Sequence, residues 1–220
     1  MSKVPRWLKP YFKENDSEHL RQFVQGIEAS TQAELVPLIV RSSIDLPLFR
    51  GLLMTMSFVI TLVISPWVHA HISWNFPFSF EAVEIIIGMV LMLLAFFAGG
   101  SSTMVKFVFN KSYLQNSVFR RACAEFFENQ LHHTESRTAV LFMYSVIERK
   151  AMIIADPNLR KIPQSLWQLA IEKMIAAAKQ KKFVSGFEAA LQVTAVELTK
   201  HFPPLPHNTN EMADMVIIKE

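Results

Sequence analysis

Cysteine and glycine are both scarce in this sequence, which has one cysteine and six glycines among 220 residues. Because Cys123 stands alone, the chain can form no internal disulfide, which fits a reducing compartment. Loops that bind phosphate through backbone amides need glycines that allow a close approach. Three of the six glycines, Gly88, Gly99 and Gly100, lie in one apolar run and are not placed in such a loop. The sequence also lacks a P-loop, an HExxH motif, paired cysteines and a GxSxG motif. It contains no recognisable catalytic motif, and the catalytic residues are unknown.

Lysine and arginine are absent from one long segment, the 55 residues from Gly51 to Val105. Two apolar runs overlap this segment, Phe49–Val68 and Ala82–Val105, and roughly 20 helical residues are enough to cross a bilayer. A pair of buried helices in a soluble core is the alternative, but the rest of the chain is too small to cover two such runs. The sequence therefore predicts a two-helix transmembrane hairpin over residues 49–105, with the lipid bilayer as a partner.

The segment between the two apolar runs is rich in aromatic residues and contains two prolines. We expect Pro66 and Pro77 to break the helix there, because proline removes a backbone donor and clashes with the preceding turn. Trp67 and Trp74 suit the interface between membrane and water. The connection between the spans is therefore expected to lie at the membrane surface.

Basic residues flank the hairpin on both sides and are absent from its connection. By the positive-inside rule, this arrangement predicts a protein of the cell inner membrane with two spans and both termini in the cytoplasm. In residues 1–15, basic residues alternate with apolar ones, so we expect this segment to lie on the membrane surface; a frayed tail is the alternative. The basic residues are Lys3, Arg6, Lys9, Lys13, Arg41, Arg50, Lys106, Lys111, Arg120 and Arg121.

The two parts outside the hairpin, residues 16–48 and 112–220, have the patterns of an α/β domain. Apolar periodicity and short apolar runs predict a helix from about Asp16, a strand Glu34–Arg41, a helix Ser112–Leu131, strands Thr138–Val146 and Arg149–Asp156, helices Pro163–Lys181 and Val184–His201, and a strand Asp214–Lys219. Pro37 predicts an edge strand or a bulge. One helix and one strand cannot bury a core, so both parts are expected to fold together, with helices on both faces of a few strands.

Oxygen-bearing side chains gather at the predicted strand ends and in the loops beside them. Carboxylate and amide oxygens are the ligands that Ca²⁺ or Mg²⁺ prefers, so these residues form the candidate metal site. Capping and turn formation is the alternative role. Weaker candidates are the His132-His133 pair with Glu135, and Cys123 between arginines. The candidate metal ligands are Glu34, Asp156, Asn210, Glu211 and Asp214.

Several ordered segments resemble the TPM domain family, which includes a thylakoid acid phosphatase and many membrane-tethered bacterial proteins. The segments are Glu28–Ser43, Ser136–Leu159, the helix with Trp167, Lys181–Leu191 and His201–Asp214. The resemblance implies a three-layer α/β/α sandwich with a small mixed sheet. It also implies divalent-metal binding or phosphatase activity. The sequence departs from the phosphatase pattern, because Glu148-Arg149-Lys150 replaces an Asp-Arg pair and Ala155-Asp156-Pro157-Asn158 replaces a glycine-rich turn.

Two functions are compatible with these observations. The favoured hypothesis is a membrane-anchored module that binds another protein, in the assembly or maintenance of a membrane complex. The alternative is a divalent-metal-dependent phosphatase-like hydrolase. The net charge of +3 and the lack of a basic stripe with interleaved aromatics give no reason to expect a nucleic-acid partner.

Overall fold

The computed structural model describes residues 4–71, 79–134, 136–204 and 216–220. Contacts divide the chain into two compact units, Met1–Ser43 with Ser112–Glu220, and Ile44–Lys111. The first unit is therefore built from both ends of the sequence, and the second is an insertion between them.

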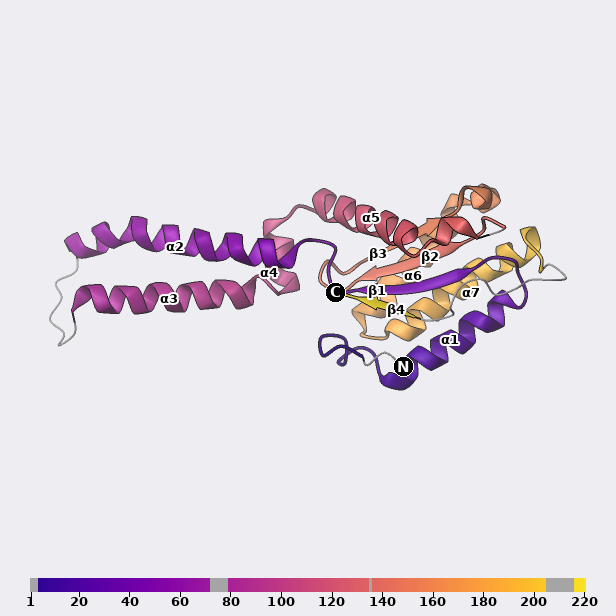
Figure 1. Cartoon of the computed structure of the whole chain (residues 1–220), viewed down its shortest axis with the longest axis horizontal. Coiled ribbons are helices and arrows are strands. Elements are labelled where there is room, and N and C mark those ends of the chain that lie inside the picture. Colours follow the sequence, from indigo (N-terminus) through magenta and orange to yellow (C-terminus); the bar gives the residue numbers. More distant parts are fainter. Residues whose placement is uncertain (1–3, 72–78, 135, 205–215) are drawn as a thin grey trace. The chain divides into compact units, whose positions relative to one another are not determined.

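A four-stranded mixed sheet forms the middle of the first unit (Figure 1). Its order is β3-β2-β1-β4, where the strands are β1 (Leu35–Val40), β2 (Val140–Ser145), β3 (Lys150–Ala155) and β4 (Ile217–Lys219). β1 pairs in parallel with β2 and with β4, and β3 runs antiparallel to β2. The short connection between Ser145 and Lys150 suits this antiparallel pairing.

Helices cover both faces of this sheet, because alternate side chains of each strand point to opposite sides. On one face, Leu35 and Ile39 of β1 belong to a core shared with α1 (Glu14–Glu28), α6 (Gln164–Lys179) and α7 (Phe183–His201). On the other face, Val36, Leu38 and Val40 pack with α5 (Lys111–Glu128). Two 3-10 turns, Leu131–His133 and Pro157–Lys161, complete the described elements. The expected α/β sandwich with a small mixed sheet is confirmed.

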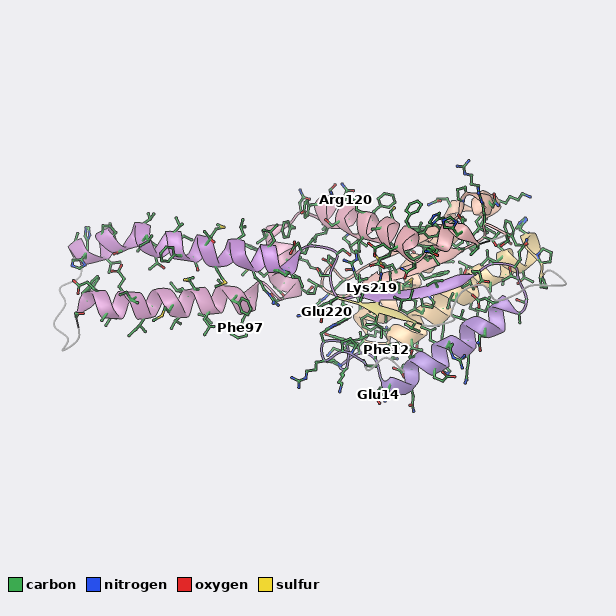
Figure 2. The ribbon with its side chains drawn as sticks, viewed as in Figure 1. Phe12, Glu14, Phe97, Arg120, Lys219 and Glu220 are labelled. Carbon is green, nitrogen blue, oxygen red and sulfur yellow. The ribbon has the colours of Figure 1, made fainter. Side chains whose placement is uncertain are left out.

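The N-terminal segment, which we expected to be a separate membrane-surface element, is part of this core. Val4, Leu8 and Phe12 are buried among the residues that cover the α1, α6 and α7 face, and Phe12 (labelled in Figure 2) is only 1% exposed. The basic side chains Arg6 and Lys9 remain exposed. The apolar half of the pattern therefore packs in the protein core, and the basic half stays at the surface of the domain.

The expectation that Pro37 marks an edge strand is wrong, since β1 has a neighbour on each side. The amide of Arg41 donates to the carbonyl of Lys219 in β4, and the carbonyl of Glu34 accepts from the amide of Val140 in β2. The backbone groups of odd-numbered residues of β1 therefore point towards β4, and those of even-numbered residues towards β2. Pairing with β4 begins only at Leu38, opposite Ile217. Pro37 therefore lies on the β4 side just before the ladder starts, where its missing donor removes no bond of the described ladder.

The second unit consists of α2 (Leu46–His71), α3 (Phe80–Ala98) and the short α4 (Ser102–Val108). Both long helices are apolar enough to cross a membrane, with mean hydropathy values of 1.9 and 2.3. Only 6% of the most apolar stretch of each helix is buried, whereas the core helix of a soluble protein would be mostly buried. The two helices pack against each other.

Two sequence expectations about these helices need correction. Pro66 does not break the helix, because α2 continues to His71 with Pro66 inside it; apolar spanning helices tolerate proline when neighbouring groups satisfy the freed carbonyl. The second apolar helix ends at Ala98, where Gly99 caps it, and α4 begins after Ser101. Pro77 and Trp74 lie outside the described residues.

Candidate functional site

Glu34 and Asp156, two of the predicted metal ligands, lie at the same end of the sheet. The carbonyl of Glu34, just before β1, accepts a hydrogen bond from the amide of Val140 at 2.8 Å. The amide of Asp156, just after β3, donates to the carbonyl of Ala139 at 3.0 Å. Because Ala139 and Val140 are neighbours at the start of β2, the fold brings together two residues that are far apart in the sequence.

The Asp156 side chain completes the end of the β2–β3 ladder. Its Oδ2 accepts a hydrogen bond from the backbone amide of Ala139 at 3.2 Å, and the residue is only 5% exposed. Burial raises the pKa of this carboxyl, while the Ala139 amide and the nearby charges of Arg137 and His132 offset part of the rise. The side chain makes no cap hydrogen bond to the 3-10 turn Pro157–Lys161 that follows it; it accepts from a backbone donor of the sheet instead.

The remaining predicted ligands, Asn210, Glu211 and Asp214, lie outside the described residues, as does Glu135. Within the described ranges, no three His, Cys, Asp or Glu side chains come close enough to hold a metal ion. Burial raises the pKa of the Cys123 thiol, and a thiol with a raised pKa is a poor nucleophile. The metal site therefore stays a prediction, and Cys123 fits the role of an ordinary helix residue.

Glu148, where the sequence departs from the phosphatase-like pattern, ties the carboxyl ends of β1 and β2 together. It is 1% exposed. Its Oε1 accepts hydrogen bonds from the hydroxyl of Ser42 at 2.8 Å and the amide of Ser43 at 3.0 Å, and its Oε2 accepts from the hydroxyl of Ser145 at 2.5 Å. A carboxylate held by three donors within the protein fits a structural role at this end of the sheet.

A groove of about 800 Å³ runs along β3 between α5 and α6, and we call it the β3 groove. The volume falls within the range typical of ligand sites. β3 forms one side of the groove, and residues of α5 and α6 line its flanks. The lining outside β3 consists of Gln115, Val118, Phe119, Asp156, Pro157, Leu159, Arg160, Ile162, Gln164, Trp167, Gln168, Ile171 and Ile175.

The outer edge of β3 has no strand beside it in the described part of the chain. In an antiparallel pair, the residues that exchange backbone hydrogen bonds with the partner alternate with residues whose N–H and C=O groups point away from it. Asp156 bonds to Ala139, so Ile154, Met152 and Lys150, opposite Leu141, Met143 and Ser145, also point to β2. The backbone groups of Ala151, Ile153 and Ala155 therefore point outward into the groove.

Apolar side chains and the glutamines Gln115, Gln164 and Gln168 line the groove, and a basic residue lies towards each end of it. Met152 and Ile154 are half-buried on the α5 side, and Ile153 is half-buried on the α6 side, whereas every residue of β1 and β2 is buried. Lys150 lies at one end of β3 and Arg160 follows its other end, and both line the groove. Among the described residues that line the groove, only Asp156 is acidic, and its carboxylate accepts the Ala139 amide.

The sequence predicted β3 as a strand, but we did not identify it as an edge strand. Its apolar run resembles that of a strand buried on both faces. The structure agrees with this pattern, because helices flank both faces of β3. Only the strand order leaves one side unpaired. The charged residues at the two ends, Lys150 and Arg160, are the one sequence signal of an edge strand.

Residues 99–196 match the family model of the TPM domain. The chain contains a TPM domain over these residues. The match contains three of the five resembling segments, Ser136–Leu159, the Trp167 helix and Lys181–Leu191, and it contains every residue that lines the β3 groove.

In fold, the chain is similar to the BA42 protein from the psychrophilic bacterium Bizionia argentinensis sp. nov., a structure determined by NMR. The TM-score is 0.57, the sequence identity is 13%, and the comparison covers 99% of each chain. This likeness shows the fold alone. No curated protein matches the chain.

Proposed function

We propose that this TPM-domain protein is a membrane-anchored module that binds another protein, in the assembly or maintenance of a membrane complex. The observation that carries the proposal is the β3 groove, where side chains of α5 and α6 flank the outward backbone groups of an edge strand. Unpaired strand edges are usually covered, charged or shortened to prevent association. Here a space of about 800 Å³ stays open beside the edge, which suits a partner.

The two long apolar helices support membrane anchoring. α2 and α3 are long and apolar enough to cross a bilayer and leave their apolar side chains exposed. Basic residues flank this unit, and none lies between Gly51 and Val105. We therefore propose a location in the cell inner membrane, with both termini and the domain in the cytoplasm. A topology reporter fused after Glu220 should give a cytoplasmic signal, and a periplasmic signal would overturn this orientation.

Connectivity also supports a role at the membrane. The chain passes from the domain to the apolar helices after Ser43 and returns before Ser112, so the domain carries two tethers. Anchoring raises the effective concentration of the domain relative to any partner in the same membrane. A weak groove contact is then sufficient for association.

Site-specific photocrosslinking in native membranes tests the interaction directly. A photoreactive phenylalanine analogue replaces Ile153, whose backbone points into the groove. The matched control carries the same analogue at Val196, an apolar side chain of α7 that is 69% exposed and does not line the groove. We expect a discrete protein adduct from position 153 and none from position 196. Equal labelling at both positions, or none at 153, would refute an interaction role for the groove.

The convergence of Glu34 and Asp156 at one end of the sheet supports a second candidate, the divalent-metal-dependent phosphatase-like hydrolase. Carboxylates from different strands are suitable ligands for Ca²⁺ or Mg²⁺. If this candidate is correct, millimolar Ca²⁺ or Mg²⁺ raises the unfolding temperature of the full chain, and Asp156→Asn removes that effect. Phosphoester hydrolysis that depends on the metal and is lost in the same variant would favour this function over the first.

A further inference from the structure

We propose that the partner binds the β3 groove as an extended strand, so that a short apolar segment with acidic ends extends the sheet beyond β3. This inference rests on the proposed function and names the chemistry of the partner. It follows from three properties of the groove: its free backbone groups, the apolar surface on both of its sides and the basic residue towards each end.

The outward N–H and C=O groups of Ala151, Ile153 and Ala155 are spaced as one side of a strand ladder. They can form hydrogen bonds with the backbone of any extended segment, whatever its sequence. A helical segment offers no such groups, because its backbone donors and acceptors are paired within the helix. The groove therefore selects an extended segment.

The side chains of an added strand would point alternately to the α5 side and to the α6 side. The α5 side offers Phe119 beside Gln115, and the α6 side offers Ile171 and Ile175 beside Gln168. Because each side presents apolar surface next to its glutamine, the added strand should carry apolar residues on both of its faces, like the interior strands β1 and β2. β3 has six residues, so a segment of similar length fills the edge.

The basic residues towards the ends of the groove favour acidic residues at the ends of the bound segment. Lys150 begins β3, Arg160 lies in the 3-10 turn that follows β3, and both line the groove, while the buried Asp156 carboxylate is bonded to Ala139. Acidic residues just outside the apolar core of the segment would face these two cations. This complementarity also sets the direction of the salt effect, since added salt screens exposed charge pairs.

A second copy of this chain is a poorer occupant than a separate segment. Two β3 strands could pair only if the α5 and α6 side chains that line each groove moved apart, because those side chains flank the edge on both sides. An extended segment has no such helices beside it and can enter the space directly. Self-association through β3 is nevertheless a distinct outcome of the test below.

The test uses the full chain in lipid nanodiscs and a fluorescent nine-residue peptide of five valines between pairs of aspartates. We expect saturable binding that weakens as salt is added. A second peptide carries an N-methyl group on every valine, which removes the strand donors and makes the peptide more apolar. Strand addition predicts an affinity loss of about tenfold or more, whereas purely apolar insertion predicts no loss. Lysines in place of the aspartates should also weaken binding.

A pair of variants at one position tests the same point from the protein side. Ala155→Pro removes an outward N–H without removing a bond to β2, and proline is tolerated at such edge positions. Ala155→Ser keeps the N–H. We expect Ala155→Pro to weaken peptide binding about tenfold and Ala155→Ser to leave it nearly unchanged. If Ala155→Pro lowers the unfolding temperature sharply, amide hydrogen exchange of residues 150–156 in the wild-type protein is measured instead of peptide binding to the variant. Bound peptide should slow that exchange.

The outcomes separate this inference from the proposed function. Absence of binding at millimolar peptide, or equal binding of the N-methylated peptide, overturns strand addition. Adducts from Ile153 in native membranes would then still support an interaction role by another mode. If Ala155→Pro instead abolishes self-association of the full chain, a second copy occupies the groove and the inference is wrong.

Discussion

Nζ of Lys219 lies 2.5 Å from Oε2 of Glu125, and this ion pair joins the C-terminal strand β4 to helix α5. Lys219 is labelled in Figure 2. The Glu125 side chain is 1% exposed and also accepts a hydrogen bond from Nε of Arg121 at 2.9 Å. Because β4 has only three residues, this buried carboxylate supplies much of what holds the end of the chain against the domain.

Glu125→Gln should lower the free energy of unfolding by about 2 kcal/mol, because it removes the charged partner of two cations. Lys219→Met should cost less, since the buried carboxylate keeps Arg121 as a partner. Chemical denaturation of the full chain in detergent micelles, followed by tryptophan fluorescence, measures both. The ranking would be contradicted if Lys219→Met were the more damaging change.

The Lys219 pair also predicts a pH dependence. Burial lowers the pKa of Lys219, but its hydrogen bonds to Glu125 and Glu128 and their charges outweigh burial, so the pKa lies above the ordinary value of 10.5. A raised lysine pKa contributes stability that is fully present below the unfolded value and is lost as the pH rises through the folded value. The stability difference between wild type and Lys219→Met should therefore be constant from about pH 7 to 9 and shrink above about pH 10.5.

Local patterns predicted the elements well but not their neighbours. The apolar stripe of α5, with Leu114, Val118, Ala122 and Phe126, is buried as expected. That β1 is a central strand depends on pairing with β4, which follows it by about 180 residues, and no local pattern around Pro37 records that pairing. The N-terminal segment shows the same limit, because an apolar stripe that contains Leu8 and Phe12 suits a membrane surface and a protein core equally well.

The sequence alone predicted residues of one candidate site but not the other. Glu34 and Asp156 were found because carboxylates at strand ends are visible as a pattern. Parallel pairing of β1 with β2 and antiparallel pairing of β2 with β3 place them at one end of the sheet. The β3 groove was missed because it exists only through strand order and through the positions of α5 and α6. Nothing in the segment Lys150–Ala155 itself records which of its sides is unpaired.

The raised pKa of Asp156 predicts how stability changes with pH. Burial, the largest cause, raises that pKa above 3.8 despite the Ala139 amide, so the folded state binds the proton more tightly than the unfolded chain does. Ionised Asp156 therefore costs stability at neutral pH, and this cost disappears as the pH falls through the folded pKa. Asp156→Asn, which keeps an oxygen for the Ala139 amide, should be at least as stable as wild type at pH 7, with a smaller advantage near pH 4.

Asp156→Ala is the matched control for this prediction. It removes the charge together with the acceptor and leaves the buried Ala139 amide unsatisfied, which should cost about 1–2 kcal/mol at pH 7. Thermal unfolding of the three proteins at both pH values measures the effects. An asparagine variant as unstable as the alanine variant would show that the charge, and not the acceptor, stabilises this end of the sheet.

Gly99 gives Arg50 room beside the end of α3. A Cβ at Gly99 would lie 2.8 Å from Cγ and 3.3 Å from Cα of Arg50, so the backbone of α2 would have to shift. The guanidinium of Arg50 lies 5.0 Å from the ring centre of Phe96, and that contact depends on the same spacing. Gly99→Ala should therefore destabilise the packing of α2 on α3 by about 1–3 kcal/mol.

Gly51→Ala is the control for the Gly99 variant, because a Cβ at Gly51 meets nothing within 4 Å. Alanine is also the better helix former, so this change should be neutral or slightly stabilising. Unfolding of the full chain in mixed micelles with increasing denaturing detergent compares the two. Equal stability of both variants would show that Arg50 moves away at no cost.

Phe119 and Phe127 give the clearest comparison for the β3 groove, because both are exposed phenylalanines of the same helix. Phe119 is 48% exposed and lines the groove, whereas Phe127 is 60% exposed and does not.

Serine at either position should change the stability of the domain by about 0.5 kcal/mol or less, as is usual for exposed sites. Only Phe119→Ser removes apolar surface that a bound segment would cover. It should therefore weaken photocrosslinking from position 153 several-fold, and Phe127→Ser should leave it unchanged. If both variants lose the crosslink equally, the partner covers α5 more broadly than the groove alone.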